Sequence, residues 1–299
     1  MRSAGWFGRC FAGVVLSAVV GVSGCQKQPD ASRSEAKGAG ITIRYEAPTD
    51  PDRDDAAFLR KRKLVEEAVS AVTALVEVER PFSIGVVSCD GEGSSYDPER
   101  TRVEVCYDEV SETRELLRRA GPRRTDEGVA AVMLETLFHE TAHALVDVLG
   151  LRLRGREEDV ADQFAAVMLL REGAPGQERL LAAADAWHLS EVTNENVDDE
   201  PDEHSSDGQR AVNHRCYVYG AAPGRHRDLV GPAILPAERA EACAEEWNAV
   251  RTAWMTALAP HLRESREGGV RVRSAGDTAR GQRGARPHCS EAGSRQLNG

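Results

Sequence analysis

The hydrophobic pattern predicts short strands early in the chain and helices after them. Residues 41–47, 82–89 and 102–107 have the length and the branched apolar residues of strands. The stretch 91–98 contains two glycines and an Asp-Pro pair, which are turn residues, so we expect the last two strands to form a hairpin. In residues 55–79, valines recur at helical spacing and define one face of a helix. They are Val65, Val69, Val72 and Val76.

A long buried helix is expected between Thr125 and Gly150. Thr125 can cap its start, and Asp126 and Glu127 place negative charge at the positive end of the helix. Apolar residues cover most of its girth, so we expect this helix to lie inside the protein. They are Val132, Leu134, Leu137, Phe138, Ala142, Leu145, Val146 and Val148.

Further helices are expected toward the C-terminal side. One covers 158–171 and another covers 177–189; an acidic loop at 195–203 and mixed helical segments follow. Because strands come first and helices later, we expect an α+β fold. Residues 41–262 are enough for one sizeable core, so we interpret them as a single domain.

The two ends of the chain differ from this body. Residues 1–24 have a basic start, an apolar run too short to span a bilayer, and small residues before Cys25, as in an export signal. This arrangement resembles a bacterial lipobox, so we expect a cell-envelope lipoprotein with a lipid on Cys25 as its only membrane contact. An ordinary signal peptide or a short membrane anchor is the alternative. Residues 25–40 predict a flexible tether, and residues 263–299 predict a disordered tail.

The remaining cysteines are expected to form disulfides, which an oxidising compartment allows. Cys89 and Cys106 each close a predicted strand and form the first expected pair; Cys216 and Cys243 form the second. Cys289 is left over, and the sequence leaves the connectivity open. Zinc ligation by cysteines is the competing interpretation, but the chain contains no Cys-x-x-Cys.

The chain is acidic, with 38 Lys and Arg residues against 49 Asp and Glu residues and a formal net charge of −11. Nonspecific binding to nucleic acid or to anionic lipid rests on cationic contacts with phosphate. We therefore expect no nucleic-acid partner and no electrostatic attachment to a membrane. The charge does not identify a substrate.

The chemistry is concentrated in His139-Glu140-Thr141-Ala142-His143, an HExxH motif inside the long buried helix. Histidines four apart in a helix project from nearly the same side, so both can bind one tetrahedral zinc ion. Glu140 lies beside them, where it can act as a general base on a zinc-activated water. A chance string on a solvated helix is the alternative. However, two histidines and a glutamate in a buried helix are costly unless something binds them.

An enzymatic zinc ion needs a third protein ligand. The helix after Gly155 offers Glu157, Glu158, Asp159 and Asp162. We expect Glu158 to be the ligand, with Glu157 as the alternative. Asp162 lies on the same face as Glu158 and can accept a hydrogen bond from a ligand histidine, which fixes its tautomer. Acidic residues also favour a helix start, which accounts for part of this cluster but not for Asp162, a full turn in.

Four stretches carry a resemblance to a known family. They are Tyr96-Asp97-Pro98 with Cys106-Tyr107, residues 139–147, residues 155–165, and Asp202-Glu203-His204-Ser205 with residues 216–220. Together they resemble the metallopeptidase family catalogued as domain of unknown function 4344, over most of residues 41–250. The pairing of HExxH with residues 158–162 also resembles the gluzincin arrangement of HtpX-like and CAAX-type peptidases. These resemblances imply a zincin-like fold and peptidase activity.

His204 lies between carboxylates in the acidic loop. In zincins, a histidine or tyrosine beyond the ligands often donates a hydrogen bond to the oxyanion that forms when water attacks a carbonyl. His204 is a candidate for this role, with Tyr217 and Tyr219 as alternatives, and a surface histidine is the other interpretation. We interpret the other histidines as structural or exposed. They are His188, His214, His226, His261 and His288.

The sequence thus predicts a zinc-dependent hydrolase that acts on peptide or protein substrates. A non-catalytic cell-surface module that keeps a zinc ion or binds a partner is the alternative. The intact Glu140 argues against it, because a structural zinc site has no use for that carboxylate. A non-peptide amidase with the same site is a weaker option. No feature of the sequence defines a substrate side-chain pocket or an oligomeric state.

Overall fold

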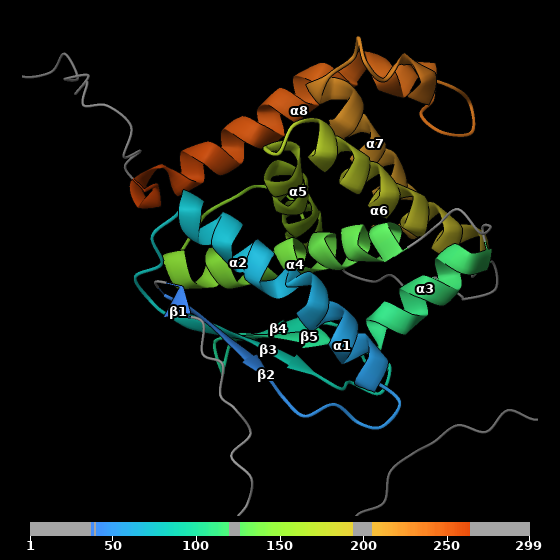
Figure 1. Ribbon diagram of the computed structural model, residues 1–299. Coiled ribbons are helices and arrows are strands. Elements are labelled where there is room, and N and C mark those ends of the chain that lie inside the picture. The colour runs from blue at the N-terminus through green and yellow to red at the C-terminus, as the bar shows by residue number, and fades with distance from the viewer. Residues whose placement is uncertain (1–36, 39, 120–125, 194–204, 264–299) are drawn as a thin grey trace, which may run out of the picture.

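One small sheet forms the lower side of the molecule, and helices build outward from it (Figure 1). The computed structural model describes residues 37–38, 40–119, 126–193 and 205–263. The strands lie in the order β1-β2-β3-β5-β4. Their bounds are β1 Lys37–Gly38, β2 Ile41–Tyr45, β3 Phe82–Val87, β4 Ser95–Asp97 and β5 Arg102–Cys106. The fold class is α+β, as predicted.

The predicted hairpin is wrong, because β3 and β5 run parallel to each other. Ser83 lies opposite Arg102, and Val87 lies opposite Cys106. The antiparallel partner of β5 is β4, a three-residue edge strand that the hydrophobic pattern did not reveal. The true hairpin turn follows Asp97, whose Oδ1 accepts two backbone N–H groups of the turn at 2.9 and 3.1 Å. The glycine-rich loop before β4 instead carries the chain from β3 past β5.

The predicted helix 55–79 is two helices, α1 (Arg53–Arg62) and α2 (Leu64–Leu75). Lys63 separates them in a left-handed conformation with φ 56°, which ends α1 and redirects the chain. The valine face is nevertheless correct, since Val65, Val69 and Val72 are all buried. Helix α2 packs on β1 and β2.

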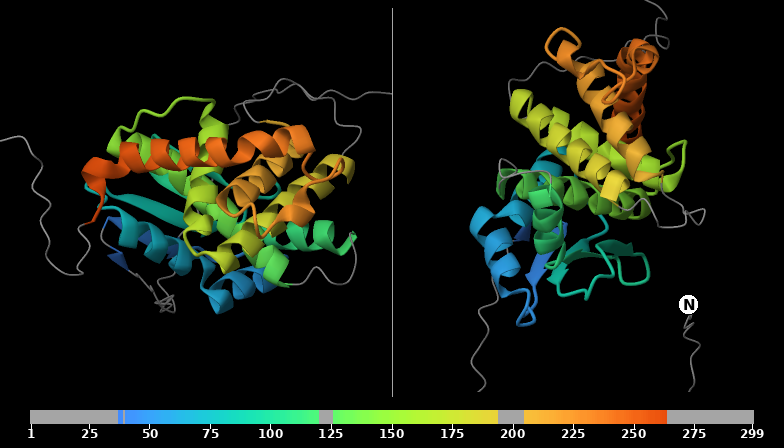
Figure 2. Two further views of the ribbon diagram at one scale, coloured as in Figure 1. Left: turned by 90° about the horizontal axis from the view of Figure 1, so that it is seen from above. Right: turned by 90° about the vertical axis from the view of Figure 1, so that its right-hand side faces the viewer.

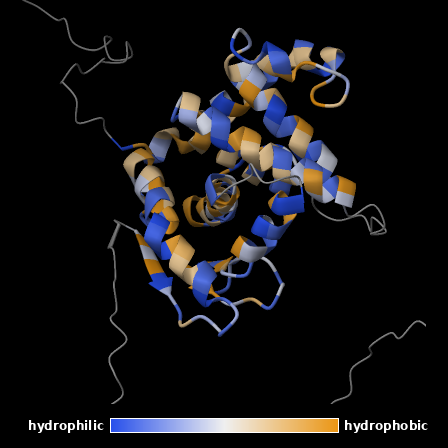
Figure 3. Cartoon of the chain, turned by 45° about the vertical axis from the view of Figure 1, so that its right-hand side comes forward, coloured by the Kyte–Doolittle hydropathy of each residue, from blue (hydrophilic) through white to orange (hydrophobic). Residues whose placement is uncertain are grey.

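Helix α4 (Asp126–Leu149) is the centre of the molecule, as its apolar girth predicts. It contacts β4 and β5 on one side, α2 and α3 (Glu109–Arg119) at its flanks, and α5 and α6 on the other side. The colouring by hydropathy shows hydrophobic residues gathered toward the interior and hydrophilic residues spread over the outer helices (Figure 3). Helix α4 ends at Gly150, which has φ 61°. The predicted cap, Thr125, lies outside the described residues.

The C-terminal half is a stack of helices. Figure 2 shows α8 running along this side of the molecule. The elements are α5 (Glu157–Leu170), α6 (Ala174–Thr193), α7 (Asp207–Ala221), the short 3-10 helices η1 (Arg227–Leu229) and η2 (Ala259–His261), and α8 (Ala237–Leu258). The indole of Trp254 on α8 packs against Phe164 and donates a hydrogen bond to the carbonyl of Val160 at 3.2 Å. These contacts hold α8 against α5.

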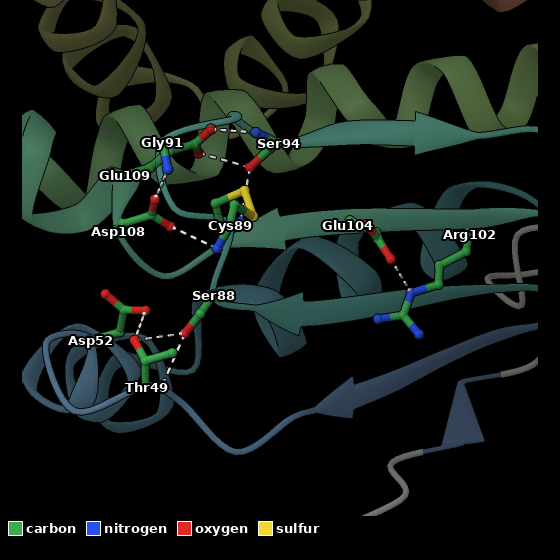
Figure 4. Close-up of a disulfide and its surroundings, with 11 residues drawn as sticks. Thr49, Asp52, Ser88, Cys89, Gly91, Ser94, Arg102, Glu104, Asp108 and Glu109 are labelled. Atoms are coloured by element: carbon green, nitrogen blue, oxygen red, sulfur yellow. Dashed lines mark hydrogen bonds and ion pairs between the residues drawn. A yellow bond between two sulfur atoms is a disulfide. The ribbon is translucent and has the colours of Figure 1, made fainter. Parts of the chain in front are cut away.

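Both predicted disulfide pairs are confirmed. Cys89–Cys106 joins the ends of the parallel strands β3 and β5, and Cys216–Cys243 joins α7 to α8. Figure 4 shows the first bridge with Asp108, which accepts the backbone N–H groups of Cys89 and Gly91. The two disulfides indicate an extracytoplasmic protein.

Among the described helices, none combines the length and the apolarity that crossing a bilayer requires. The predicted export signal (1–24), the lipidation site Cys25, most of the tether (25–40) and nearly all of the predicted tail (263–299) lie outside the described residues. The predictions for these segments stay predictions.

Candidate metal centre

His139 and His143 lie one turn apart on α4 and turn their rings toward each other. Their Nε2 atoms are 3.2 Å apart, and their ring centroids are 5.0 Å apart. Helix α4 sets this spacing, because residues four apart lie nearly above one another on a helix. His139 is buried, and His143 is partly open to solvent.

Glu158, in the first turn of α5, brings a carboxylate to both rings. Its Oε2 lies 3.0 Å from Nε2 of His139 and 3.5 Å from Nε2 of His143. Glu157 meets only Nδ1 of His143, at 3.2 Å, and its side chain is 73% exposed. Of the two candidates for the third ligand, Glu158 is therefore the one that faces the point where the two Nε2 atoms converge.

The three converging atoms fit a tetrahedral zinc ion. Zinc binds nitrogen and oxygen ligands at about 2.0–2.2 Å, so ligand atoms at the corners of a tetrahedron are about 3.3 Å apart. The three distances between Nε2 of His139, Nε2 of His143 and Oε2 of Glu158 are 3.0, 3.2 and 3.5 Å. Two imidazoles with one carboxylate are a donor set typical of zinc.

Asp162 lies one turn beyond Glu158 and holds the far side of His139. Its Oδ1 is 2.8 Å from Nδ1 of His139. This bond leaves Nε2 of His139 free to face the other candidate ligands. Arg210 of α7 in turn binds Asp162 with two hydrogen bonds, from Nη2 to Oδ1 at 2.6 Å and from Nε to Oδ2 at 2.8 Å.

Arg210 is a residue of this site that was not predicted from the sequence. A signal was present in the pattern of α7: Arg210 and His214 are four apart, and both share the buried face of this helix with Ala211 and Val218. A charged residue on a buried helical face needs a partner. The sequence could have identified the need for a partner but not Asp162 as the one that meets it.

Glu140 is buried beside the histidines. Its carboxylate makes no hydrogen bond to any described residue, and the residue is 8% exposed. Burial raises its pKa, although the two neighbouring histidines oppose this shift. A carboxylate with a raised pKa and no hydrogen-bonded partner is suited to proton transfer.

The charges around His139 favour a cation. Burial alone would lower the pKa of this imidazole, but hydrogen bonds to Asp162 and Glu158 outweigh it and raise the pKa to about 10. Burial opposes ionisation of Glu158, yet its contacts with His139 and His143 hold its pKa well below the usual range. The carboxylates around this point thus stabilise positive charge, whether carried by a proton or by a metal ion.

A second buried polar pair involves Glu135, which lies one turn before His139 in α4. Nε2 of His214 is 3.0 Å from Oε1 of Glu135, and both residues are almost fully buried. Together with Asp162 they form another group of possible ligands. Both oxygens of Asp162 are engaged by Arg210, however, and the guanidinium already supplies the positive charge there. We interpret this pair as structural, which agrees with the prediction for His214.

Within the described part of the chain, none of the remaining candidates belongs to the group of converging donors. His204 lies outside the described residues, so its role stays a prediction, and His288 does too. Tyr217 is buried against Trp247, with ring centroids 6.0 Å apart. Nε2 of His226 is 2.8 Å from Oε1 of Gln177, which gives it a structural partner.

The fold and the convergent donors define a class: an α+β protein with a candidate metal centre of two histidines and one glutamate. The chain belongs to the family catalogued as domain of unknown function 4344, described as "Putative metallopeptidase", whose model matches residues 45–258. This confirms the family resemblance and supports a metal-dependent peptidase at that level. No curated protein and no solved structure matches the chain.

Proposed function

We propose that the protein is a zinc-dependent peptidase with a zincin-like fold and a gluzincin-type ligand set. His139, His143 and Glu158 hold the metal, and Glu140 is the general base. The observation that carries the proposal is the convergence of two Nε2 atoms and one carboxylate oxygen at 3.0–3.5 Å from one another. Family membership supports a metal-dependent peptidase at the level of the class.

A bound zinc ion supplies Lewis acidity, which polarises a carbonyl group and lowers the pKa of water. The protein supplies the positions and the proton transfer. Glu140 accepts the proton of the attacking water and passes it to the leaving amine. Its raised pKa suits both steps, because the carboxyl group must first take the proton and then release it.

The surroundings of His143 support a peptide substrate. A cavity of about 430 Å³ opens beside His143 and Glu157. Its wall includes the side chains of Val146, Leu153 and Val160, and this apolar surface can receive a substrate side chain next to the scissile bond. Arg152 at the same cavity adds a cationic group.

His204 remains our candidate for the oxyanion donor. Its neighbour Ser205 donates a hydrogen bond to Oδ1 of Asp159 at 2.7 Å, in the first turn of α5. The chain that follows His204 is therefore held at the same helix turn that carries Glu158. This supports the proposed role, which replacement of His204 by alanine tests: kcat should fall while zinc content stays constant.

The main test is Glu140→Gln in the full chain loaded with zinc. Hydrolysis of casein or of a peptide library should fall by about 10²–10⁴-fold, because the general base is lost. One zinc per chain and the melting temperature should be retained, because Glu140 is not a ligand. Glu127→Gln, in the exposed first turn of the same helix, is the control and should leave hydrolysis unchanged.

Two results would contradict the proposal. One is a Glu140→Gln variant as active as the wild type. The other is a zinc-loaded wild type that turns over neither casein nor the library. The second result would favour a non-catalytic binding module.

A further inference from the structure

Arg210 is a buried arginine that reaches the candidate metal centre from α7. It is 7% exposed, and its guanidinium meets both oxygens of Asp162. Nη2 also approaches Nδ1 of His139 to 3.5 Å. A group from a third helix thus lies directly behind the ligand histidine of α4 and the acid of α5.

The two hydrogen bonds to Asp162 are the fork that a planar guanidinium makes with a carboxylate, and they restrict rotation of that carboxylate. Oδ1 of Asp162 is shared between Nη2 of Arg210 and Nδ1 of His139. The orientation of the carboxylate therefore also sets the orientation of the His139 ring. Without Arg210, two of the three hydrogen bonds on this carboxylate would be lost.

Arg210 is itself held in place from two directions. Its guanidinium carbon lies 3.5 Å from the centre of the Trp187 ring, on α6, which is a cation–π contact. The start of α7 is capped by Ser206, whose hydroxyl accepts the N–H of Gln209 at 3.3 Å. The position of the guanidinium is thus set by contacts from α6 and α7.

We propose that Arg210 is a positioning residue for the metal centre: through Asp162 it fixes the His139 ring and so sets the zinc affinity of the site. This inference rests on the proposed function, because it assumes that His139 is a ligand. If the inference is correct, α7 influences metal binding although it carries none of the three proposed ligands.

The test measures the zinc dissociation constant of the full chain by competition with a chromophoric chelator. Arg210→Met removes the fork and keeps the bulk, and should weaken zinc binding by about 10–100-fold, as loss of groups behind metal ligands does. Arg210→Lys keeps the buried charge and should give an intermediate value. This second variant also covers the case in which Arg210→Met fails to fold.

The matched control is Arg215→Met. Arg215 is a buried arginine on the same helix, and it is paired with Asp185 at 3.2 Å rather than with Asp162. Its replacement should lower stability and leave the zinc dissociation constant within about twofold of the wild type.

A second readout is the absorption spectrum of the cobalt-substituted protein. This spectrum reports the geometry around the metal, and it should shift in the Arg210 variants but not in Arg215→Met. A structural role of Arg210 alone would leave it unchanged.

Wild-type zinc affinity in both Arg210 variants would overturn the inference and leave the proposed function intact. An equal loss of affinity in Arg215→Met would also overturn it, because general loosening of α7 would then explain the effect. Absence of zinc binding in the wild type would overturn the inference and the proposed function together.

Discussion

Replacing Glu158 and Glu157 in parallel tests the candidate metal centre most sharply. The two glutamates are neighbours in the first turn of α5 and carry the same charge. Glu158 is 14% exposed and lies near both Nε2 atoms, whereas Glu157 is 73% exposed and touches only Nδ1 of His143. Glu→Gln at each position removes one charge and keeps the size of the side chain. A difference in zinc affinity between the two variants therefore shows which glutamate binds the metal.

The expected magnitudes differ widely. A tetrahedral zinc site of four ligands binds with about 10–16 kcal/mol, so one ligand accounts for about 3 kcal/mol, or on the order of 100-fold in the dissociation constant. Glu158→Gln should therefore weaken zinc binding by at least this factor. Glu157→Gln removes only an exposed contact, which contributes at most about 1 kcal/mol, or roughly fivefold.

The assay is a competition titration of zinc against a chelator at a fixed pH of 7.5, followed by metal analysis of the dialysed proteins. Glu158→Gln should lose its zinc on dialysis, and Glu157→Gln should keep one ion per chain. The reverse order would show that Glu157 is the ligand. If both variants lost only a little zinc affinity, and to the same extent, then α4 and α5 would not supply three zinc ligands.

Three further predictions concern stability. Burial raises the pKa of Glu109 from 4.5 to about 7. The native protein therefore holds a proton on Glu109 that the unfolded chain releases between these pH values, so the contribution of Glu109 to stability falls by about 3 kcal/mol as pH rises through this window. Glu109→Gln should remove this contribution, so between pH 5 and 8 the free energy of unfolding of the variant should fall less than that of the wild type in denaturant unfolding. The disulfide Cys216–Cys243 joins residues that are 27 positions apart in the sequence. Replacing both cysteines by alanine should lower the free energy of unfolding by about 3.5 kcal/mol in the same assay. A Cβ on Gly220 would lie 2.2 Å from the carbonyl oxygen of Cys243. Gly220→Ala should therefore lower the free energy of unfolding by about 1–3 kcal/mol. A Cβ on Gly208 would meet only a flexible side chain, so Gly208→Ala should not destabilise the protein.

The parts of this structure that were predicted correctly depend on local rules. The spacing of His139 and His143 fixes their common side because it is a property of any helix. Helix α4 and the start of α5 followed from acidic residues, glycines and apolar periodicity, and these positioned Glu158 and Asp162 correctly relative to each other. The valine face of α2 followed from the same periodicity.

The parts that failed depend on how distant segments pack. The pairing of β3 with β5 was mistaken for a hairpin because the pattern of a strand does not state the direction of its neighbour. The three-residue strand β4 is too short to show a period. Asp162 and Arg210 are 48 residues apart, and Glu135 and His214 are 79 apart. Only the stacking of α4, α5 and α7 brings these pairs together.

The balance of buried charge links the candidate metal centre to the fold. Arg210 compensates Asp162, so this pair adds no net charge behind His139. The convergence point is then faced by Glu158 and Glu140, two carboxylates, and by the rings of His139 and His143, whose pKa values are raised because contacts with the carboxylates outweigh burial. Buried charge is tolerated only when it is compensated, and either protons on the two rings or a divalent cation can compensate the two carboxylates. The packing of α4 against α5 therefore gathers negative charge that a cation can balance, and α7 contributes by pairing Arg210 with Asp162.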